Sequence, residues 1–297
     1  MVNKPIIKIV FATASKLPSL TADDQLAIEY LRRQEIEVEP RIWDSDGPSL
    51  AGFSGVVIRS CWDYHLKPQQ FLEWLSQIES QGVPVWNPVP VVAWNLDKHY
   101  LKELSEKGVP VPPTVWLEQS CKADLAAILE EQGWGKAVVK PTISATAFET
   151  WITTPEQARL DQAGLEEMLK RAGVMVQQFV PEVQTHGEWS FIFFGGAYSH
   201  AVLKRARQGE FRVQDEYGGY LDSALPPDAL IEQAARVVDR IEHELIFARV
   251  DGIERDNKLY LMELELIEPF LYLGHDPLAV ERFGEAIISA LNSRPRL

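Results

Sequence analysis

Three acidic residues and an arginine near the carboxyl end of the chain have the spacing of a charged cluster on two neighbouring strands. Side chains two apart in a strand point to the same face, so Glu263 and Glu265 share one face of an otherwise apolar segment. Arg249 and Asp251 share a face of the preceding strand, and the short connection makes the two strands expected partners. Ionised carboxylates on an apolar face are costly without a positive partner, and Mg²⁺ prefers such oxygen ligands. A solvated edge strand with outward glutamates fits the spacing as well.

Two lysines stand where a charge could reach a cleft. Lys98 ends the helical tetrad Asn95-Leu-Asp-Lys98, and Lys140 ends an apolar strand. The stretch from Pro141 to Glu149 is rich in small and hydroxylated residues, whose backbone N–H groups and hydroxyls could cover phosphates. A solvated surface position fits each lysine taken alone, and an ordinary loop fits the stretch. The patterns GxxxxGK and GxGxxG are absent, so P-loop and Rossmann nucleotide sites have no support.

A third candidate segment is the apolar strand from Val174 to Val180, which ends at Pro181. An extended backbone there would have unpaired N–H and C=O groups, to which the edge of an adenine ring could hydrogen-bond. A core strand that leaves its sheet is the alternative. The six histidines lack metal-ligand spacing and the pattern GxSxG is absent, so zinc sites and hydrolase nucleophile elbows have no support.

The overall charge narrows the classes of partner. The 297 residues include 29 basic and 43 acidic side chains, and the net charge of −14 repels phosphate backbones and anionic lipid. Nucleic acid and membranes are therefore not expected partners. Two cysteines make no disulfide framework, and Lys8 interrupts the apolar run that a signal peptide would need. We therefore expect a cytoplasmic protein.

The elements around these residues divide the chain into three expected units. Strand-like and helix-like segments alternate in the first unit, which predicts a small open parallel sheet with helices at 21–33, capped by Thr21, and at 91–107. The proline-rich stretch 109–113 marks a boundary, and an antiparallel hairpin is expected at Gly195-Gly196. The fold class is thus α/β in the first unit and α+β in the other two. The expected units are residues 1–108, 109–180 and 181–297.

Five short motifs follow one another over more than half of the chain. They are Asn95 to Lys98, Val138-Val-Lys-Pro141, Met175 to Pro181, Gly187-Glu-Trp-Ser190, and Ala248-Arg-Val-Asp251 with Glu263 to Pro269. In this order they resemble the ATP-grasp superfamily, specifically its glutathione-synthetase-like branch. The segment Arg59-Ser-Cys-Trp-Asp-Tyr64 extends the likeness to the O-ureidoserine cyclo-ligases, which are cycloserine synthetase-like enzymes.

The resemblance implies an ATP-grasp fold, in which two α+β subdomains clasp ATP beside an open parallel sheet. The ATP-binding residues it implies are Lys98, Lys140, Ser144, Gln177, Gln178, Phe179, Val180 and Glu188, with adenine at 177–180 and ribose at Glu188. The ligands it implies for two Mg²⁺ ions, with Mn²⁺ as a substitute, are Asp251, Glu263 and Glu265. The catalytic residues it implies are Arg249 and Arg205, and the substrate-binding residues are Trp62, Asp63, Tyr64, Arg212, Gly218 and Gly219. The stretch 144–150 is the expected lid.

The implied activity is ATP-dependent joining of a small amino-acid-like carboxylic acid to an amine through an acyl-phosphate. The amine belongs to the same molecule, as in a cyclo-ligase, or to a second one, and a homo-oligomer (dimer or tetramer) is implied. The chain departs from the pattern twice, because no glycine follows Lys140 and Ser190 stands where several relatives carry arginine. Lys204, Arg205 or Arg212 could replace that charge. A non-catalytic ATP-binding module, or a ligase that adds amino acids to a protein tail, stays an alternative.

Overall fold

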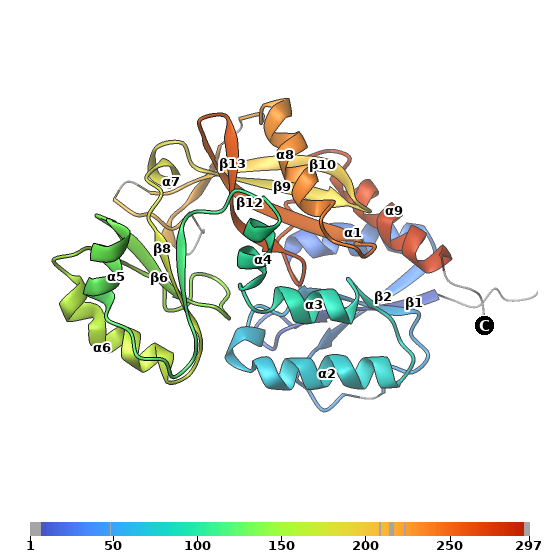
Figure 1. Cartoon of the computed structure of the whole chain (residues 1–297). Helices are drawn as coiled ribbons and strands as arrows, with labels where there is room; N and C mark the ends of the chain where they lie inside the picture. The colour runs from blue at the N-terminus through green and yellow to red at the C-terminus, as the bar shows by residue number, and fades with distance from the viewer. Residues whose placement is uncertain (1–6, 48, 208, 214–216, 223, 294–297) are drawn as a thin grey trace, which may run out of the picture.

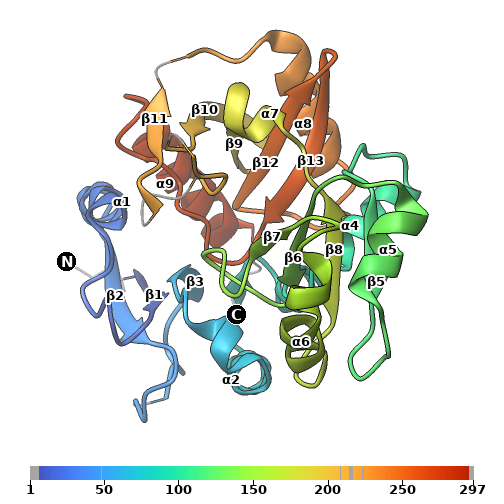
Figure 2. The same ribbon diagram turned by 90° about the vertical axis from the view of Figure 1, so that its left-hand side faces the viewer.

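The structure is a computed structural model that describes residues 7–47, 49–207, 209–213, 217–222 and 224–293. Its strands form three sheets of four, four and five strands among these residues. Figure 1 shows the first sheet in blue, the second in green and the third in yellow to red, and Figure 2 gives the view at 90°. Within the described ranges, no helix combines the length and the apolar character that crossing a bilayer requires.

The first sheet is parallel, with the strand order β2-β1-β3-β4, which confirms the predicted open parallel sheet. Thr21 caps helix α1 as predicted, because its hydroxyl accepts the Asp24 N–H at 3.1 Å and its backbone N–H donates to the Asp24 carboxylate. The elements of this unit are β1 (Ile7–Thr13), α1 (Ala22–Arg33), β2 (Ile36–Ile42), β3 (Gly55–Ser60), a 3₁₀ turn (Tyr64–Leu66), α2 (Pro68–Ser80), β4 (Val85–Trp86), α3 (Val89–Asn95) and α4 (Tyr100–Glu106).

The prediction of one helix over 91–107 was wrong, because α3 and α4 are separated by a break at 96–99. In the break, the backbone N–H of Lys98 donates to the carbonyl of Thr142 at 2.8 Å instead of continuing the helical ladder. Lys98 therefore lies at the joint between the first unit and the second sheet.

The second sheet is antiparallel, with the order β5-β8-β6-β7, and it has a hydrophobic core of its own with the two helices of this unit. Its elements are β5 (Thr114–Leu117), α5 (Leu125–Gln132), β6 (Ala137–Pro141), β7 (Trp151–Thr153), α6 (Ala158–Leu169) and β8 (Val174–Gln178).

The third sheet is antiparallel, with the order β11-β10-β9-β12-β13, and the predicted hairpin at Gly195-Gly196 joins β9 to β10. Both turn glycines have positive φ, at 56° and 80°, which glycine adopts without strain. The elements are α7 (Glu182–Thr185), β9 (Glu188–Phe194), β10 (Ala197–Arg205), β11 (Tyr220–Asp222), α8 (Asp228–Val238), β12 (Phe247–Arg255), β13 (Lys258–Glu265) and α9 (Ala279–Asn292).

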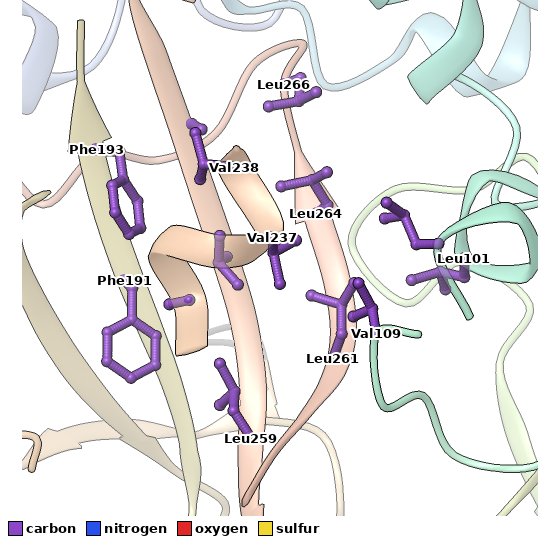
Figure 3. Close-up of a cluster of buried hydrophobic side chains, with 14 of the residues drawn as sticks. Leu101, Val109, Phe191, Phe193, Val237, Val238, Leu259, Leu261, Leu264 and Leu266 are labelled. Carbon is purple, nitrogen blue, oxygen red and sulfur yellow. The ribbon is translucent and has the colours of Figure 1, made fainter. Parts of the chain in front are cut away.

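The first unit and the third sheet share their cores. One core joins Leu101 of α4 to Leu261 and Leu264 of β13, and Figure 3 shows these side chains facing one another. Another core joins α1 and the first sheet to α9 and to Phe247 of β12. The two units therefore form a common body, and the second sheet has a core of its own but contacts that body through Met175 of β8 and Trp116 of β5.

The outer edge of β13 is closed by side chains instead of another strand. The Asn95 amide donates to the carbonyl of Leu264 and accepts the N–H of Leu266, both at 2.8 Å. Asn87 similarly bonds the carbonyl of Leu266 at 2.8 Å and the N–H of Ile246 at 2.9 Å. Leu261 and Leu264 of β13 also donate their N–H groups, to the Pro110 carbonyl and the Tyr100 hydroxyl, so these contacts together take the place of a neighbouring strand and hold β13 in register with the first unit.

We expect Asn95→Ala to lower the free energy of unfolding by about 2 to 4 kcal/mol, because it leaves two buried backbone groups unpaired at roughly 1 to 3 kcal/mol each. Urea unfolding followed by fluorescence measures this change. Asn292→Ala, at an exposed position at the end of α9, is the matched control and should stay within about 0.5 kcal/mol of the parent. Equal stability of the two variants would show that the edge contacts contribute nothing.

Candidate active site

A cavity of about 430 Å³ is lined by residues from all three units. The predicted site residues that line it are Trp62, Tyr64, Lys98, Lys140, Ser144, Gln177, Gln178, Phe179, Val180, Glu188, Arg212, Arg249, Asp251, Glu263 and Glu265. The structure does not bring Asp63, Arg205, Gly218 or Gly219 into its lining.

The four charged residues predicted on two strands meet on one wall of the cavity. In the antiparallel pair β12 and β13, Arg249 stands opposite Glu265 and Asp251 opposite Glu263. The Arg249 guanidinium bonds both Asp251, at 2.9 Å, and Glu265. Glu263 pairs with the Lys98 ammonium at 3.1 Å. The pairing of the two strands thus assembles an acidic wall in which each carboxylate has a cation beside it.

The electrostatics of this wall are dominated by burial. Burial alone would raise the pKa of Asp251, but Arg249 and Lys204 lower it to about 2. Burial raises the pKa of Glu265 to about 7, against the opposing effect of Arg249 and with a further rise from Asp251 and Glu263. The ionised form of Glu265 is therefore costly in this wall, and an added cation beside it would stabilise that form.

The donor set fits Mg²⁺ that arrives with phosphates. Among the residues described, no group of three or more His, Cys, Asp or Glu side chains is placed to hold a metal ion. Protein Mg²⁺ sites commonly use only one or two carboxylates and take their other ligands from water and substrate phosphates. Asp251, Glu263 and Glu265 offer hard oxygen atoms on the cavity wall, and a divalent ion would favour the ionised form of Glu265, whose pKa is raised by burial and by the other two acids.

The two predicted lysines both reach the cavity, from different units. Lys98 is buried, and its ammonium bonds the Ser144 carbonyl at 2.6 Å in addition to Glu263. Lys140 lies at the end of β6, where burial lowers the pKa of its ammonium despite the nearby Glu263. The described residues offer Lys140 no ion pair within 4.0 Å. Its charge is therefore available to an anionic ligand.

The loop after Lys140 carries backbone strain where glycines are missing. Thr146, Ala147 and Glu149 have φ values of 50°, 54° and 48°, a left-handed conformation that costs roughly 1 to 2 kcal/mol for a residue with a side chain. Arg171 bonds both carboxylate oxygens of Glu149 at 3.0 Å, and the Phe148 ring lies 5.1 Å from the ring of His65. Contacts on both sides therefore hold this loop over the cavity.

We expect Ala147→Gly to raise the free energy of unfolding by about 0.5 kcal/mol, because relief of the left-handed strain exceeds the backbone entropy that glycine loses. Ala145→Gly is the matched control, since the φ of Ala145 is not among the positive ones, and it should lower stability by about 0.5 to 1 kcal/mol. Urea titration of the two variants gives the sign of each change. A loss of stability in Ala147→Gly equal to that of the control would contradict the strain at this position.

The strand predicted to receive adenine differs in its backbone from the prediction. The N–H of Gln178 donates to the Pro113 carbonyl at 2.8 Å, and that of Phe179 donates to the Lys136 carbonyl at 3.1 Å. The expectation that these two groups are unpaired was wrong, because the chain before β5 and β6 continues the ladder. The cavity wall beyond them is apolar and includes side chains that the sequence reasoning missed. These are Val183, Phe211, Val213 and Met262, which pack with Phe179 and Val180.

Lys204 supplies the charge that is missing at Ser190. Its ammonium, on β10 beside β9, bonds Glu188 at 2.6 Å and Asp251 at 3.1 Å, and the Ser190 hydroxyl donates to Asp251 at 2.6 Å. Arg205 follows in the strand and points to the other face, where it bonds Asp222 at 2.7 Å. The prediction of Arg205 as a catalytic residue is therefore corrected, and Lys204 takes its place on the cavity wall.

Some of the predicted substrate-binding residues line the cavity, and the others lie outside it. Trp62 and Tyr64 line the cavity, whereas the Asp63 carboxylate accepts the indole N–H of Trp43 at 2.8 Å outside it. Arg212 also lines the cavity, with its guanidinium 2.7 Å from Glu210 and 3.6 Å from the centre of the Tyr217 ring. Gly218, which lies beside the side chain of Arg207, and Gly219 are not among the residues that line the cavity.

One buried acid was not singled out from the sequence. Glu268 follows β13, lines the cavity and is largely buried, and the indole N–H of Trp62 donates to its backbone carbonyl at 3.0 Å. Burial, together with Glu265 and Glu263, raises the pKa of its carboxyl well above the usual range. Glu268 belongs to the motif from Glu263 to Pro269, but the sequence predicts no role for it, because no spacing rule marks a single acid in a loop.

The chain has an open parallel sheet followed by two antiparallel sheets, and lysines and acids line the same cavity. This arrangement defines the ATP-grasp fold. The comparisons with known proteins agree, because the chain is homologous to ATP-grasp ligases of the class that joins carboxylates to amines. Residues 9–87 match the family described as the N-terminal domain of the D-cycloserine synthetase DcsG.

Individual relatives give the same result. The cycloserine biosynthesis protein DcsG of Streptomyces lavendulae is 29% identical over 282 residues, which cover 89% of this chain and 92% of that protein. The crystal structure of D-cycloserine synthetase DcsG superposes with a TM-score of 0.84 at 25% identity, covering 96% of this chain and 99% of that one. A D-alanine–D-alanine ligase from Bacillus anthracis solved with ATP shares the fold, with a TM-score of 0.70, 14% identity and coverage of 97% and 98%.

Proposed function

We propose that the cavity is the active site of an ATP-dependent ligase that activates a small, amino-acid-like carboxylic acid as an acyl-phosphate and transfers the acyl group to an amine. The observation that carries this proposal is the meeting of Lys98 and Lys140 with Asp251, Glu263 and Glu265 in one cavity. The amine belongs either to the same molecule, as the likeness to a D-cycloserine synthetase suggests, or to a second one.

The polarity of the cavity supports one orientation of ATP. Lys98, Lys140 and the loop at Ser144 lie where they would bind the phosphates, since Lys140 has no ion pair among the residues that the structure describes. The apolar wall at Phe179 and Val180 suits the faces of the adenine ring. Glu188 also lines the cavity and would accept hydrogen bonds from the ribose hydroxyls.

Asp251, Glu263 and Glu265 would hold the Mg²⁺ ions, of which we propose two, with Mn²⁺ as a substitute. Bound there, the ions would neutralise charge on the phosphates during transfer. The described residues of this chain supply the rest. Arg249 and Lys204, both bonded to Asp251, keep the carboxylate ionised and aimed at the cavity.

The proposed reaction has two steps. A carboxylate oxygen of the acid attacks the γ-phosphorus of ATP, which releases ADP and leaves an acyl-phosphate. An amine then attacks the acyl carbon, phosphate departs with the bonding electrons, and a proton leaves the amine. Positioning and charge neutralisation dominate the catalysis of phosphoryl transfer, and the two lysines and Arg249 would provide both. The loop at 144–150 would exclude water, which would otherwise hydrolyse the mixed anhydride.

The proposed division of labour follows the packing. Units 1–108 and 181–297 share their cores, so they would move together as one body. Unit 109–180, which has a core of its own, would close against this body over ATP. We also propose that the protein forms a homo-oligomer. Measurement of its molecular mass in solution would test this.

Phosphate release from ATP, measured with a panel of amino acids and simple amines in the presence of Mg²⁺, tests the proposed function. We expect release that depends on one acid and stops when EDTA removes the metal. ATP binding without release for any member would favour the non-catalytic reading. Release that requires a protein substrate would favour the ligase that extends a protein tail.

A further inference from the structure

The segment 268–274 follows β13 and forms part of the cavity wall, although it belongs to no helix or strand. We call it the wall segment. Glu268, Phe270 and Tyr272 line the cavity, and the two residues between them are buried. An irregular segment has no ladder of backbone hydrogen bonds, so other groups must fix its position.

Side chains hold the backbone of the wall segment instead. Each of the four carbonyls at 268–271 accepts a hydrogen bond from a different side chain, at 3.0 or 3.1 Å. The donors, in the order of the carbonyls, are Trp62, Arg59, Arg249 and His200. His200 donates from Nε2, because a carbonyl oxygen can only accept. Of the four donors, Arg59 and His200 do not line the cavity.

Arg59 holds the wall segment from the first unit. It lies in β3 and is 3% exposed, and its guanidinium bonds the Asp24 carboxylate at 2.7 Å as well as the Pro269 carbonyl. The neighbouring Asp23 accepts the N–H of Gly274 at 3.1 Å, at the far end of the segment. The start of α1 and the end of β3 therefore hold the wall segment near both of its ends.

His200 holds the same segment from the third sheet. It lies in β10 and is 6% exposed. Its Nε2 lies 3.0 Å from the Leu271 carbonyl, and its Nδ1 lies 2.9 Å from the Ser199 hydroxyl. The guanidinium of Arg282 on α9 in turn donates to the Ser199 carbonyl at 2.7 Å. The ring is therefore fixed at both nitrogens, and the wall segment is bonded to both units of the common body.

We propose that Arg59 and His200 are positioning residues, which act on the reaction through the wall segment. The inference rests on the proposed function. Arg249 bonds the Phe270 carbonyl at 3.1 Å as well as Asp251, so the wall segment is joined directly to the acidic wall. A shift of this segment would misplace the reacting groups, and a misplacement of about 1 Å can lower a rate by about 100-fold. The apolar wall proposed for adenine is made by other elements, so ATP binding should not depend on these bonds.

Arg59→Lys tests the bond from the first unit. Lysine keeps a cation beside Asp24, but its single ammonium does not reproduce the fork that bonds Asp24 and Pro269 together. With an accepted acid, we expect kcat/KM to fall by about 10- to 100-fold, as for one lost hydrogen bond of a charged group, while the affinity for ATP with Mg²⁺ stays the same. Arg32→Lys, exposed on α1, is the matched control and should behave as the parent does.

Two variants of His200 test the bond from the third sheet. Leucine fills a similar volume and offers no donor, so His200→Leu should lower kcat/KM for the acid by about 10-fold. The side-chain amide of glutamine has an N–H to offer the Leu271 carbonyl, so His200→Gln should recover most of this loss. A role in packing alone would favour leucine over glutamine, because glutamine brings polar groups into a buried position.

Hydrogen exchange reports on the wall segment without any turnover. In Arg59→Lys and His200→Leu, the amides of 270–274 should exchange at least about 10-fold faster than in the parent, because a bond that holds them is lost. The amides of β12 should keep their protection, since neither change removes a bond of that strand.

Four outcomes would overturn the inference. They are parent-like kcat/KM in Arg59→Lys or in His200→Leu, an equal loss in His200→Gln and His200→Leu, exchange of the wall segment that is no faster, and a fall in ATP bound per chain that matches the fall in activity. The last would show that the residues only support the fold. If Arg59→Lys does not fold, the two His200 variants decide. If the parent releases no phosphate with any acid, the proposed function fails, and hydrogen exchange of the same variants then decides the inference by itself.

Discussion

Replacing Glu263 with glutamine should lower kcat by about 100- to 1000-fold while the protein stays folded, because loss of a metal-binding carboxylate removes several kcal/mol of transition-state stabilisation. Glutamine keeps the shape of the side chain and lacks its charge. Lys98 in the pair with Glu263 is buried, but its ammonium keeps the bond to the Ser144 carbonyl and a glutamine oxygen at 263 can still accept from it, so the fold should survive the change. Steady-state phosphate release and thermal unfolding of the same sample measure the two effects.

The matched control is Glu254→Gln, on β12 of the same hairpin and outside the cavity lining. It should keep full activity. Undiminished turnover in Glu263→Gln would contradict the assignment of the acidic wall to Mg²⁺, whatever the behaviour of the other acids.

Replacing Lys140 with alanine should weaken ATP binding by about 10- to 100-fold, the effect of losing one charge-assisted hydrogen bond to phosphate. Since burial lowers the pKa of this ammonium and no described residue forms an ion pair with it, its removal should not lower the melting temperature. Calorimetric titration with ATP and Mg²⁺ gives the affinity, and Lys102→Ala, exposed on α4, is the control. Parent-like affinity in Lys140→Ala would place the phosphates elsewhere.

The acidic wall could be predicted from the sequence because it depends on two local rules. Side chains alternate along a strand, and a short connection makes consecutive strands pair. Together these rules bring Asp251 and Glu263 opposite each other, as the register of β12 and β13 shows. The parallel first sheet was predictable for a similar reason, since its alternating strands and helices are local patterns.

Features that depend on register or on distant packing could not be predicted. Lys204 reaches Asp251 because β10 pairs with β9 at one particular offset, and a shift of one residue would have presented Arg205 instead. Asn95 belongs to a motif that resembles relatives, yet its amide closes the edge of β13, far along the chain. The break before Lys98 likewise depends on a tertiary bond to Thr142, which overrides the helical propensity of 91–107.

The most direct test of the central claim follows oxygen from the acid to phosphate. With an accepted acid labelled with ¹⁸O in its carboxylate, an acyl-phosphate must deliver one labelled oxygen to the released phosphate, because the C–O bond to the acyl carbon breaks. Mass spectrometry of the phosphate should therefore show a single ¹⁸O per turnover, with ADP as the other product. Unlabelled phosphate, or AMP in place of ADP, would contradict the account.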